Sequence, residues 1–156
     1  MASPATRDEE RPSLTLRRHF DASPDKVWRA WTEPQALKQW FGPEEIVAVP
    51  VAEVDLRIGG GFRVVMVAAD GERHEVSGLY REIVPDRKLV FSWSWVTTPE
   101  RVSRVTVSIE PAGRGTELTL RHEDFFDEAA RDGHNHGWTG SLVKLQVLLG
   151  RARADG

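Results

Sequence analysis

Three histidines toward the C-terminal end of the chain are the residues whose types and spacing could carry chemistry. His134 and His136 stand two apart in GHNHGWTGSLVKLQVLLG, residues 133–150, and His122 lies upstream. A zinc ion needs three or four ligands that converge at about 2 Å. A spacing of two brings side chains together on a strand but turns them about 200° apart on a helix. No H-E-x-x-H or comparable spacing accompanies the pair, so we predict neither a metal site nor a cofactor.

The same histidines have a second interpretation as polar groups at the mouth of a cavity. His122 alternates with Leu118 and Leu120 and shares their strand face, and His136 comes two residues before Trp138. At a cavity mouth they would orient a ligand carbonyl or hydroxyl. They could also act as general acid or base, because histidine titrates near neutrality. A hydrogen-bonded structural histidine at the joint between sheet and helix is the simpler alternative, and we favour it over catalysis.

Aromatic side chains form the second group that could serve a site. Phe91, Trp93 and Trp95 alternate along KLVFSWSW and therefore face one side of a predicted strand, and Tyr80 lies on the preceding strand. These side chains either fill a packed core or line a partly hollow pocket in which each indole N–H finds a partner. Periodicity alone does not separate the two. The predicted ligand-binding residues are Trp40, Tyr80, Phe91, Trp93, Trp95, His122, His136 and Trp138.

The elements that must position these residues begin with one strand and two short helices. Residues 14–20 alternate apolar and polar side chains, as a half-buried strand does. In ASPDKVWRAW, Ser23 can cap a helix that begins at Pro24. TEPQALKQWFGP repeats the pattern, with Pro34 near its start and Gly42 as a stop.

Residues 45–122 predict about six further strands joined by short turns. Asp70-Gly71 between two alternating segments is a strong hairpin signal, and Pro50 interrupts the first strand of the run. Consecutive strands with short turns form an antiparallel meander. The sheet therefore needs a cover for its apolar face.

A long C-terminal helix, expected to begin near Gly137, supplies that cover. Gly137 and Gly140 are expected to permit close approach of the backbone. The apolar stripe of this helix is Trp138, Leu142, Leu145 and Leu149. The predicted fold class is α+β of the helix-grip type, in which a curved antiparallel sheet of about six or seven strands wraps around the long helix, with two short helices after the first strand.

Length and composition limit the classes of protein. The 156 residues fit one domain, expected over residues 13–150, between a disordered N-terminal tail (1–12) and a C-terminal tail (151–156). No apolar run is long enough for a membrane span, and the N-terminus lacks the apolar core of a secretion signal. The net charge of -3 and the pI near 6.0 argue against a nucleic-acid partner. Without cysteine there is no disulfide, which suits a cytoplasmic location.

Several motifs in series resemble one family. In chain order they are RHFDASPDKVWRAWTEPQALKQWFGP, DLRIGGGFRVVM, GLYREIVPDRKLVFSW, GTELTLRHEDF and HGWTGSLVKLQVLL. Over roughly residues 14–150 they resemble the activator-of-heat-shock-chaperone-ATPase-like (AHSA-like) domains of the START-like, or SRPBCC, superfamily. The resemblance implies a helix-grip fold with a cavity between sheet and helix, which in relatives holds apolar or amphipathic ligands. The superfamily also contains polyketide cyclase/aromatases and lipid-transfer proteins.

The resulting hypothesis is a protein that binds a hydrophobic or aromatic small molecule, as a monomer or a homodimer, with no assigned catalysis. One alternative is a cyclase-, aromatase- or hydrolase-like enzyme that uses a cavity histidine or Tyr80 on an aromatic or polyketide-like substrate. Another alternative is a chaperone-associated interaction domain. We favour it least, because the chaperone activators of the family carry an additional N-terminal domain, for which we expect no room in this chain.

Overall fold

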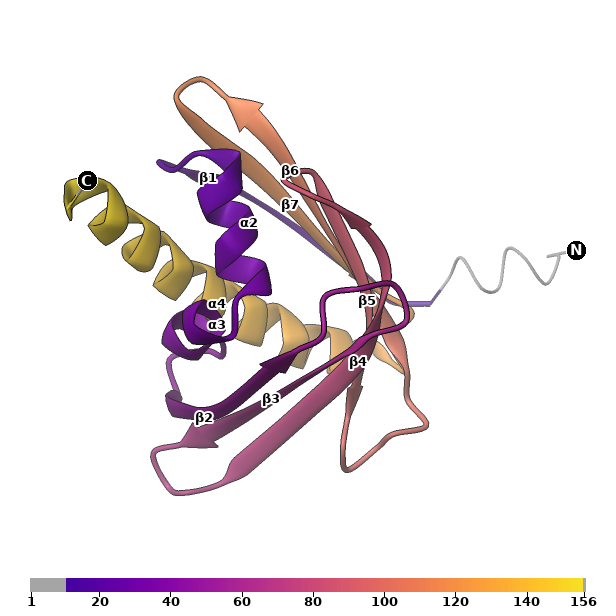
Figure 1. The fold of residues 1–156 in the computed structure, drawn as a ribbon. Coiled ribbons are helices and arrows are strands. Elements are labelled where there is room, and N and C mark those ends of the chain that lie inside the picture. The colour runs from indigo at the N-terminus through magenta and orange to yellow at the C-terminus, as the bar shows by residue number, and fades with distance from the viewer. Residues whose placement is uncertain (1–10, 156) are drawn as a thin grey trace, which may run out of the picture.

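A seven-stranded antiparallel sheet curves around the C-terminal helix (Figure 1). The computed structural model describes residues 11–155, with side chains for 11–150. The predicted disordered tail over residues 1–12 therefore lies almost entirely outside the described residues. Within the described part of the chain, no helix is long and apolar enough to cross a membrane.

The strands follow one another in space with one exception. The spatial order is β1-β7-β6-β5-β4-β3-β2, so β1 and β7, the first and last strands of the chain, are neighbours. Leu14 of β1 pairs with His122 of β7, and Phe20 pairs with Thr116. The strands are β1 (Leu14–Phe20), β2 (Ile46–Val54), β3 (Gly61–Ala68), β4 (Arg73–Val84), β5 (Lys88–Trp95), β6 (Ser103–Ala112) and β7 (Gly115–Glu123). This arrangement confirms the predicted curved antiparallel sheet.

Local sequence signals account for the turns and bends. Gly71 has φ +88° in the β3–β4 hairpin, a conformation that glycine adopts without strain. Pro50 lies in β2 where the pairing with β3 shifts register between Ala48 and Val51. The residue that interrupts the alternating pattern thus marks an irregularity inside one strand, because proline cannot donate to the ladder.

The two short helices are α2 (Pro24–Thr32) and α3 (Pro34–Trp40), as predicted. Each begins with proline in its first turn, where the missing N–H is tolerated. Ser23 has the extended backbone of an N-cap residue, but its hydroxyl donates to the Asp25 carboxylate and does not cap the helix.

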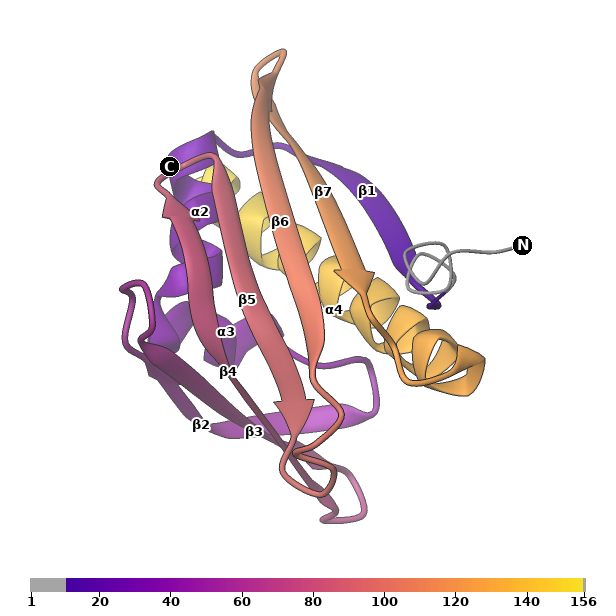
Figure 2. The same cartoon turned by 90° about the vertical axis from the view of Figure 1, so that its right-hand side faces the viewer.

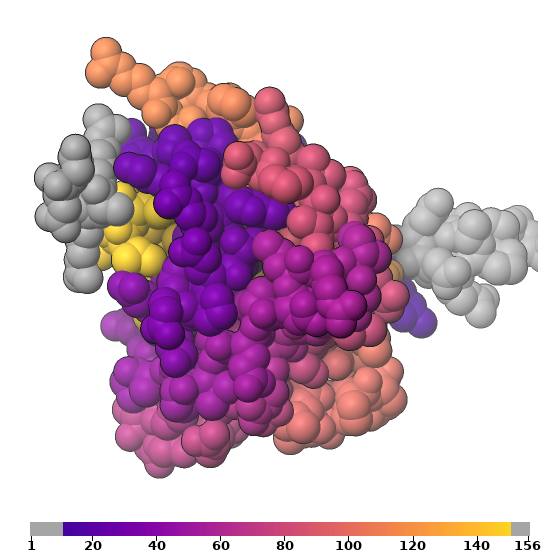
Figure 3. Space-filling model, viewed as in Figure 1, coloured from indigo at the N-terminus to yellow at the C-terminus, as the bar shows by residue number. Residues whose placement is uncertain are grey.

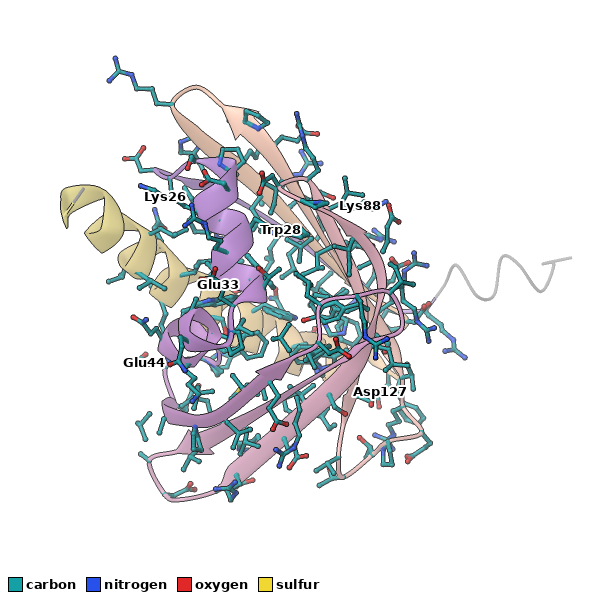
Figure 4. All side chains as sticks on the ribbon, viewed as in Figure 1. Lys26, Trp28, Glu33, Glu44, Lys88 and Asp127 are labelled. Carbon is teal, nitrogen blue, oxygen red and sulfur yellow. The ribbon has the colours of Figure 1, made fainter. Side chains whose placement is uncertain are left out.

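The long helix α4 (Glu128–Asp155) begins nine residues before Gly137, where we expected it, and it includes residues 151–155 of the predicted tail. Asp127, labelled in Figure 4, caps it: Asp127 Oδ1 accepts the N–H of Ala130 at 2.8 Å. The carboxylate of Glu128 in the first turn complements the positive end of the helix dipole. The early start places His134 and His136 on the helix itself.

The core lies between α4, the concave face of the sheet and the two short helices. The predicted apolar stripe of α4 is buried, with Leu142 1% and Leu145 0% exposed. Each such leucine contributes about 1.5–3 kcal/mol to folding. In Figure 2 the sheet covers one side of α4, and in Figure 3 α2 and α3 cover its other side. The yellow part of α4 is therefore largely hidden and shows mainly at the left of Figure 3.

Only one of the two predicted glycine contacts is present. A Cβ atom on Gly140 would lie 2.9 Å from Pro43 Cα, so α4 approaches the connection between α3 and β2 closely there, as expected. The same atom on Gly137 would meet nothing within 4 Å, so the expectation was wrong for Gly137. Gly137 instead borders open space.

Candidate functional site

A cleft of about 350 Å³ opens between α4 and one end of the sheet. We call it the main cleft. Its walls come from strands β3 to β5, from the connection between α3 and β2, and from the first half of α4. The larger apolar side chains that line it are Phe41, Ile46, Met66, Trp93, Trp95 and Trp138.

His134, on α4, accepts hydrogen bonds from two of these tryptophans. Its Nε2 accepts the indole N–H of Trp93 at 3.2 Å and that of Trp95 at 2.9 Å. Its Nδ1 lies 2.7 Å from the carbonyl oxygen of Ala130, which can only accept, so Nδ1 carries the proton. Burial lowers the pKa of His134, against a smaller opposite effect of the Ala130 bond. The ring is therefore neutral, with both nitrogens in use.

His122 plays the corresponding part for the third tryptophan. Its Nδ1 accepts the indole N–H of Trp138 at 3.0 Å, so the proton lies on Nε2, which donates to Ser103 Oγ at 2.7 Å. The Ser103 hydroxyl donates onward to the carbonyl oxygen of Trp93 at 3.3 Å. Burial lowers the pKa of His122 well below its ordinary value, and the nearby His134 lowers it further. This is the satisfied histidine at the joint between sheet and helix that the sequence favoured.

The rim of the main cleft is held by contacts between α4 and the connection after α3. His136 Nε2 lies 2.8 Å from Glu45 Oε1, and both side chains are more than half exposed. Ser141 Oγ accepts the N–H of Gly42 at 3.0 Å. Lys144 Nζ donates to the carbonyl oxygens of Pro43 and Ile46. These bonds fix the segment that forms one wall of the cleft.

We call the side chains of Trp93, Trp95, Trp138, His122 and His134, which these hydrogen bonds join, the tryptophan–histidine wall. A second cleft of about 360 Å³ lies on the other side of this wall. Trp93, Trp95, Ala130 and His134 line both clefts. The second cleft is more polar and includes Arg101, whose guanidinium carbon lies 3.9 Å from the ring centre of the exposed Phe126. The hydrogen bonds of His134 to Trp93 and Trp95 thus stabilise the side chains that separate the main cleft from the second cleft.

The structure distributes the predicted site residues over several places. Trp93, Trp95, His136 and Trp138 line the main cleft. Tyr80 and Phe91 line a separate cavity of only about 20 Å³, where burial raises the pKa of the Tyr80 hydroxyl, with a smaller effect from the Asp55 carboxylate. Trp40 is fully buried and donates its indole N–H to the carbonyl oxygen of Ala30 at 2.9 Å. His122 is fully buried behind Trp138.

The predicted ligand-binding residues do not include His134, Phe41, Met66 and Glu45, all of which line the main cleft. The sequence pattern offered His134 only as a metal ligand. A signal for it existed, because His134 lies four residues before Trp138 and so continues the apolar stripe toward the N-terminal end of α4. Among the described side chains, no three of the His, Asp and Glu type come together in a way that could hold a metal ion.

The fold and the cleft define a helix-grip protein of the START-like, or SRPBCC, type. The family described as Activator of Hsp90 ATPase homolog 1-like protein matches residues 21–150, and the chain belongs to this family. No curated protein matches the chain significantly.

Solved structures of similar proteins agree with this assignment. The AHSA1 protein of Silicibacter pomeroyi is 32% identical with a TM-score of 0.81, over 90% of this chain and 99% of that one. A protein from Chromobacterium violaceum is 29% identical with a TM-score of 0.79, over 88% and 96% of the two chains. CalU16 of Micromonospora echinospora is 28% identical with a TM-score of 0.67, over 92% and 79%.

Proposed function

We propose that this protein binds an apolar or aromatic small molecule in the main cleft. The observation that carries the proposal is the cleft itself, a space of about 350 Å³ lined by Trp93, Trp95 and Trp138. This volume lies at the lower end of the range of small-molecule sites, which are mostly apolar with a few polar groups. Apolar surface that a ligand buries there contributes about 25 cal/mol per Å².

The hydrogen bonds behind the wall support binding by a preformed site. His134 accepts hydrogen bonds from Trp93 and Trp95, and His122 accepts one from Trp138, so groups of the protein itself orient these rings. Side chains that are already ordered lose little conformational entropy when a ligand arrives. The wall therefore favours a ligand that stacks on fixed rings over one that reorganises them.

The same bonds weigh against one part of the enzyme alternative, namely proton transfer through His122. A general acid or base must bring a ring nitrogen within about 2.6–3.2 Å of the reacting group. His122 and His134 each engage both ring nitrogens with protein groups. We therefore propose binding, and not proton transfer through these two histidines. A chaperone-associated role is the other alternative, and a pull-down with the chaperone would test it.

Mass spectrometry under native conditions tests the proposal on protein purified from its own host. We expect one or a few small molecules to remain bound. Gly137→Leu should remove them, because a Cβ atom at Gly137 meets nothing within 4 Å and the side chain would enter the cleft. Gly150→Leu is the matched control on the same helix, because the added atom there also meets nothing within 4 Å and Gly150 does not line the main cleft. A molecule retained equally by both variants would contradict a site in the main cleft.

A further inference from the structure

The wall of the main cleft offers a ligand few hydrogen-bond donors. The three indole N–H groups that could have faced the cleft point into the protein, because Trp93 and Trp95 donate to His134 and Trp138 donates to His122. What these tryptophans present to a ligand is ring surface. A carboxylate or a carbonyl would find no indole N–H to replace its water.

Donors at the rim are engaged in the same way. The N–H of Gly42 donates to Ser141 Oγ at 3.0 Å, and the Ser141 hydroxyl donates to the carbonyl oxygen of Gly137 at 2.8 Å. His136 directs its Nε2 to the carboxylate of Glu45. An anionic ligand that took the Gly42 or Ser141 donor would break its bond, and buried polar groups left without a partner are costly. His74 also lines the cleft, and its Nε2 lies 3.7 Å from the Glu72 carboxylate.

With histidines counted as neutral, the lining residues of the main cleft carry one formal charge, and it is negative. Glu45 is the lining residue with a formal charge at neutral pH, and no lysine or arginine is among the described residues that line this cleft. A backbone hydrogen bond lowers the pKa of Glu45, and the hydrogen bond from His136 lowers it further, so the carboxylate is ionised. The nearby cation is Lys144, whose ammonium is held by the carbonyl oxygens of Pro43 and Ile46.

We propose that the main cleft selects ligands in which an aromatic body carries a protonated amine, over neutral or carboxylate analogues of the same shape. This inference rests on the binding function proposed above and adds the charge of the ligand. The faces of aromatic rings attract cations, tryptophan most strongly. A solvent-exposed carboxylate about 4 Å from an ammonium adds an attraction that, at the dielectric constant of water, favours the amine by about fivefold in affinity. The same carboxylate repels an anion.

Three probes with one naphthalene body separate these contributions: 2-naphthylmethylamine, 2-naphthalenemethanol and 2-naphthoate. Their affinities are measured by isothermal titration calorimetry at about pH 7, where the primary amine is protonated. We expect the amine to bind about fivefold tighter than the alcohol, and the alcohol tighter than the carboxylate. The preference for the amine should shrink at high ionic strength, because salt screens exposed charges.

Two variants identify the source of the preference. In Glu45→Gln the ratio of amine affinity to alcohol affinity should fall to about one to two, since the local charge is removed. Glu44→Gln is the matched control, because Glu44 is the adjacent acid, exposed and labelled in Figure 4, and does not line the cleft. In Glu44→Gln the ratio of amine affinity to alcohol affinity should stay the same as in the natural protein.

The outcomes separate the two proposals. If the alcohol binds but the amine gains nothing, or the carboxylate binds as well as the amine, charge selection is overturned and the binding function stands. Charge selection by Glu45 is likewise overturned if Glu44→Gln lowers the ratio as much as Glu45→Gln. If none of the three probes binds and no molecule co-purifies from the host, both proposals fall.

Discussion

The hydrogen bond between Trp138 and His122 is the contact whose energy can be isolated most directly. Trp138 is 3% exposed and His122 0%, so neither side chain finds water when its partner is removed. His122→Leu leaves the indole N–H of Trp138 without its acceptor, and Trp138→Phe leaves Nδ1 of His122 without its donor. The double variant removes both groups and leaves neither of them unpaired.

The expected magnitudes follow from these losses. A buried polar group without a partner costs about 1–3 kcal/mol, and each single variant also loses packing, so each should lower the free energy of unfolding by about 2–4 kcal/mol. In the double variant both polar groups are gone, so the cost of an unpaired group does not enter its loss of stability. Its loss should therefore be smaller than the sum of the single losses by about 1–2 kcal/mol.

Urea unfolding followed by far-ultraviolet circular dichroism measures all four proteins, because tryptophan fluorescence would itself change with Trp138. The measurements are made at about pH 8, above the titration range of histidine. His19→Leu, on the exposed side of β1, is the control and should change stability by no more than about 0.5 kcal/mol. A coupling energy indistinguishable from zero would refute the hydrogen bond and the tautomer assigned to His122.

Three further predictions concern pH, the core and the helix. The lowered pKa values of His122 and His134 mean that below the ordinary value of 6.5 the unfolded state binds more protons than the folded state. The contribution of these two histidines to the free energy of unfolding should therefore be complete above about pH 6.5 and should decrease as the pH is lowered toward the folded-state pKa values. Urea titrations should show a shallower decrease in His122→Leu. Leu145→Ala should lower the free energy of unfolding by about 2–5 kcal/mol in the same assay, and a loss below about 1 kcal/mol would contradict its place in the core. Gly137→Ala should raise the melting temperature, since alanine favours a helix interior by about 0.5–1 kcal/mol, whereas Gly140→Ala should lower it, because overpacking there costs about 1–3 kcal/mol. Equal shifts for the two glycines in differential scanning calorimetry would contradict the close approach at Gly140.

Most of the sheet and the short helices could be predicted because each local signal agrees with the tertiary fold. Asp70-Gly71 needs a turn, and the prolines at 24 and 34 fit the first turns of helices whatever packs against them. The apolar stripe of α4 was also predictable, because helical spacing directly gives the buried face. These features depend on residues close together in sequence.

The start of α4 and the site depend on signals of another kind. Gly133 and Gly137 weaken the intrinsic helix propensity of the segment, so the sequence did not show that Asp127 caps a helix ten residues before Gly137. His134 consequently had no assigned direction. The pairing of His134 with Trp95 joins α4 to β5, and only the packing of helix on sheet decides such a contact. Periodicity gives the buried face of an element, but not which buried face is hollow.

The tryptophan–histidine wall also determines how the protein interacts with light. Five of the six tryptophans form one chain of ring contacts, from Trp40 through Trp31 and Trp138 to Trp93 and Trp95, with centroids 4.7–5.7 Å apart. At such separations an excited indole passes its energy to a neighbour before it emits. A change in the surroundings of Trp93, Trp95 or Trp138, which line the main cleft, therefore affects the emission of the whole set. If the proposed ligand occupies the main cleft, its arrival is expected to change the intrinsic tryptophan emission, and no label is needed to follow it.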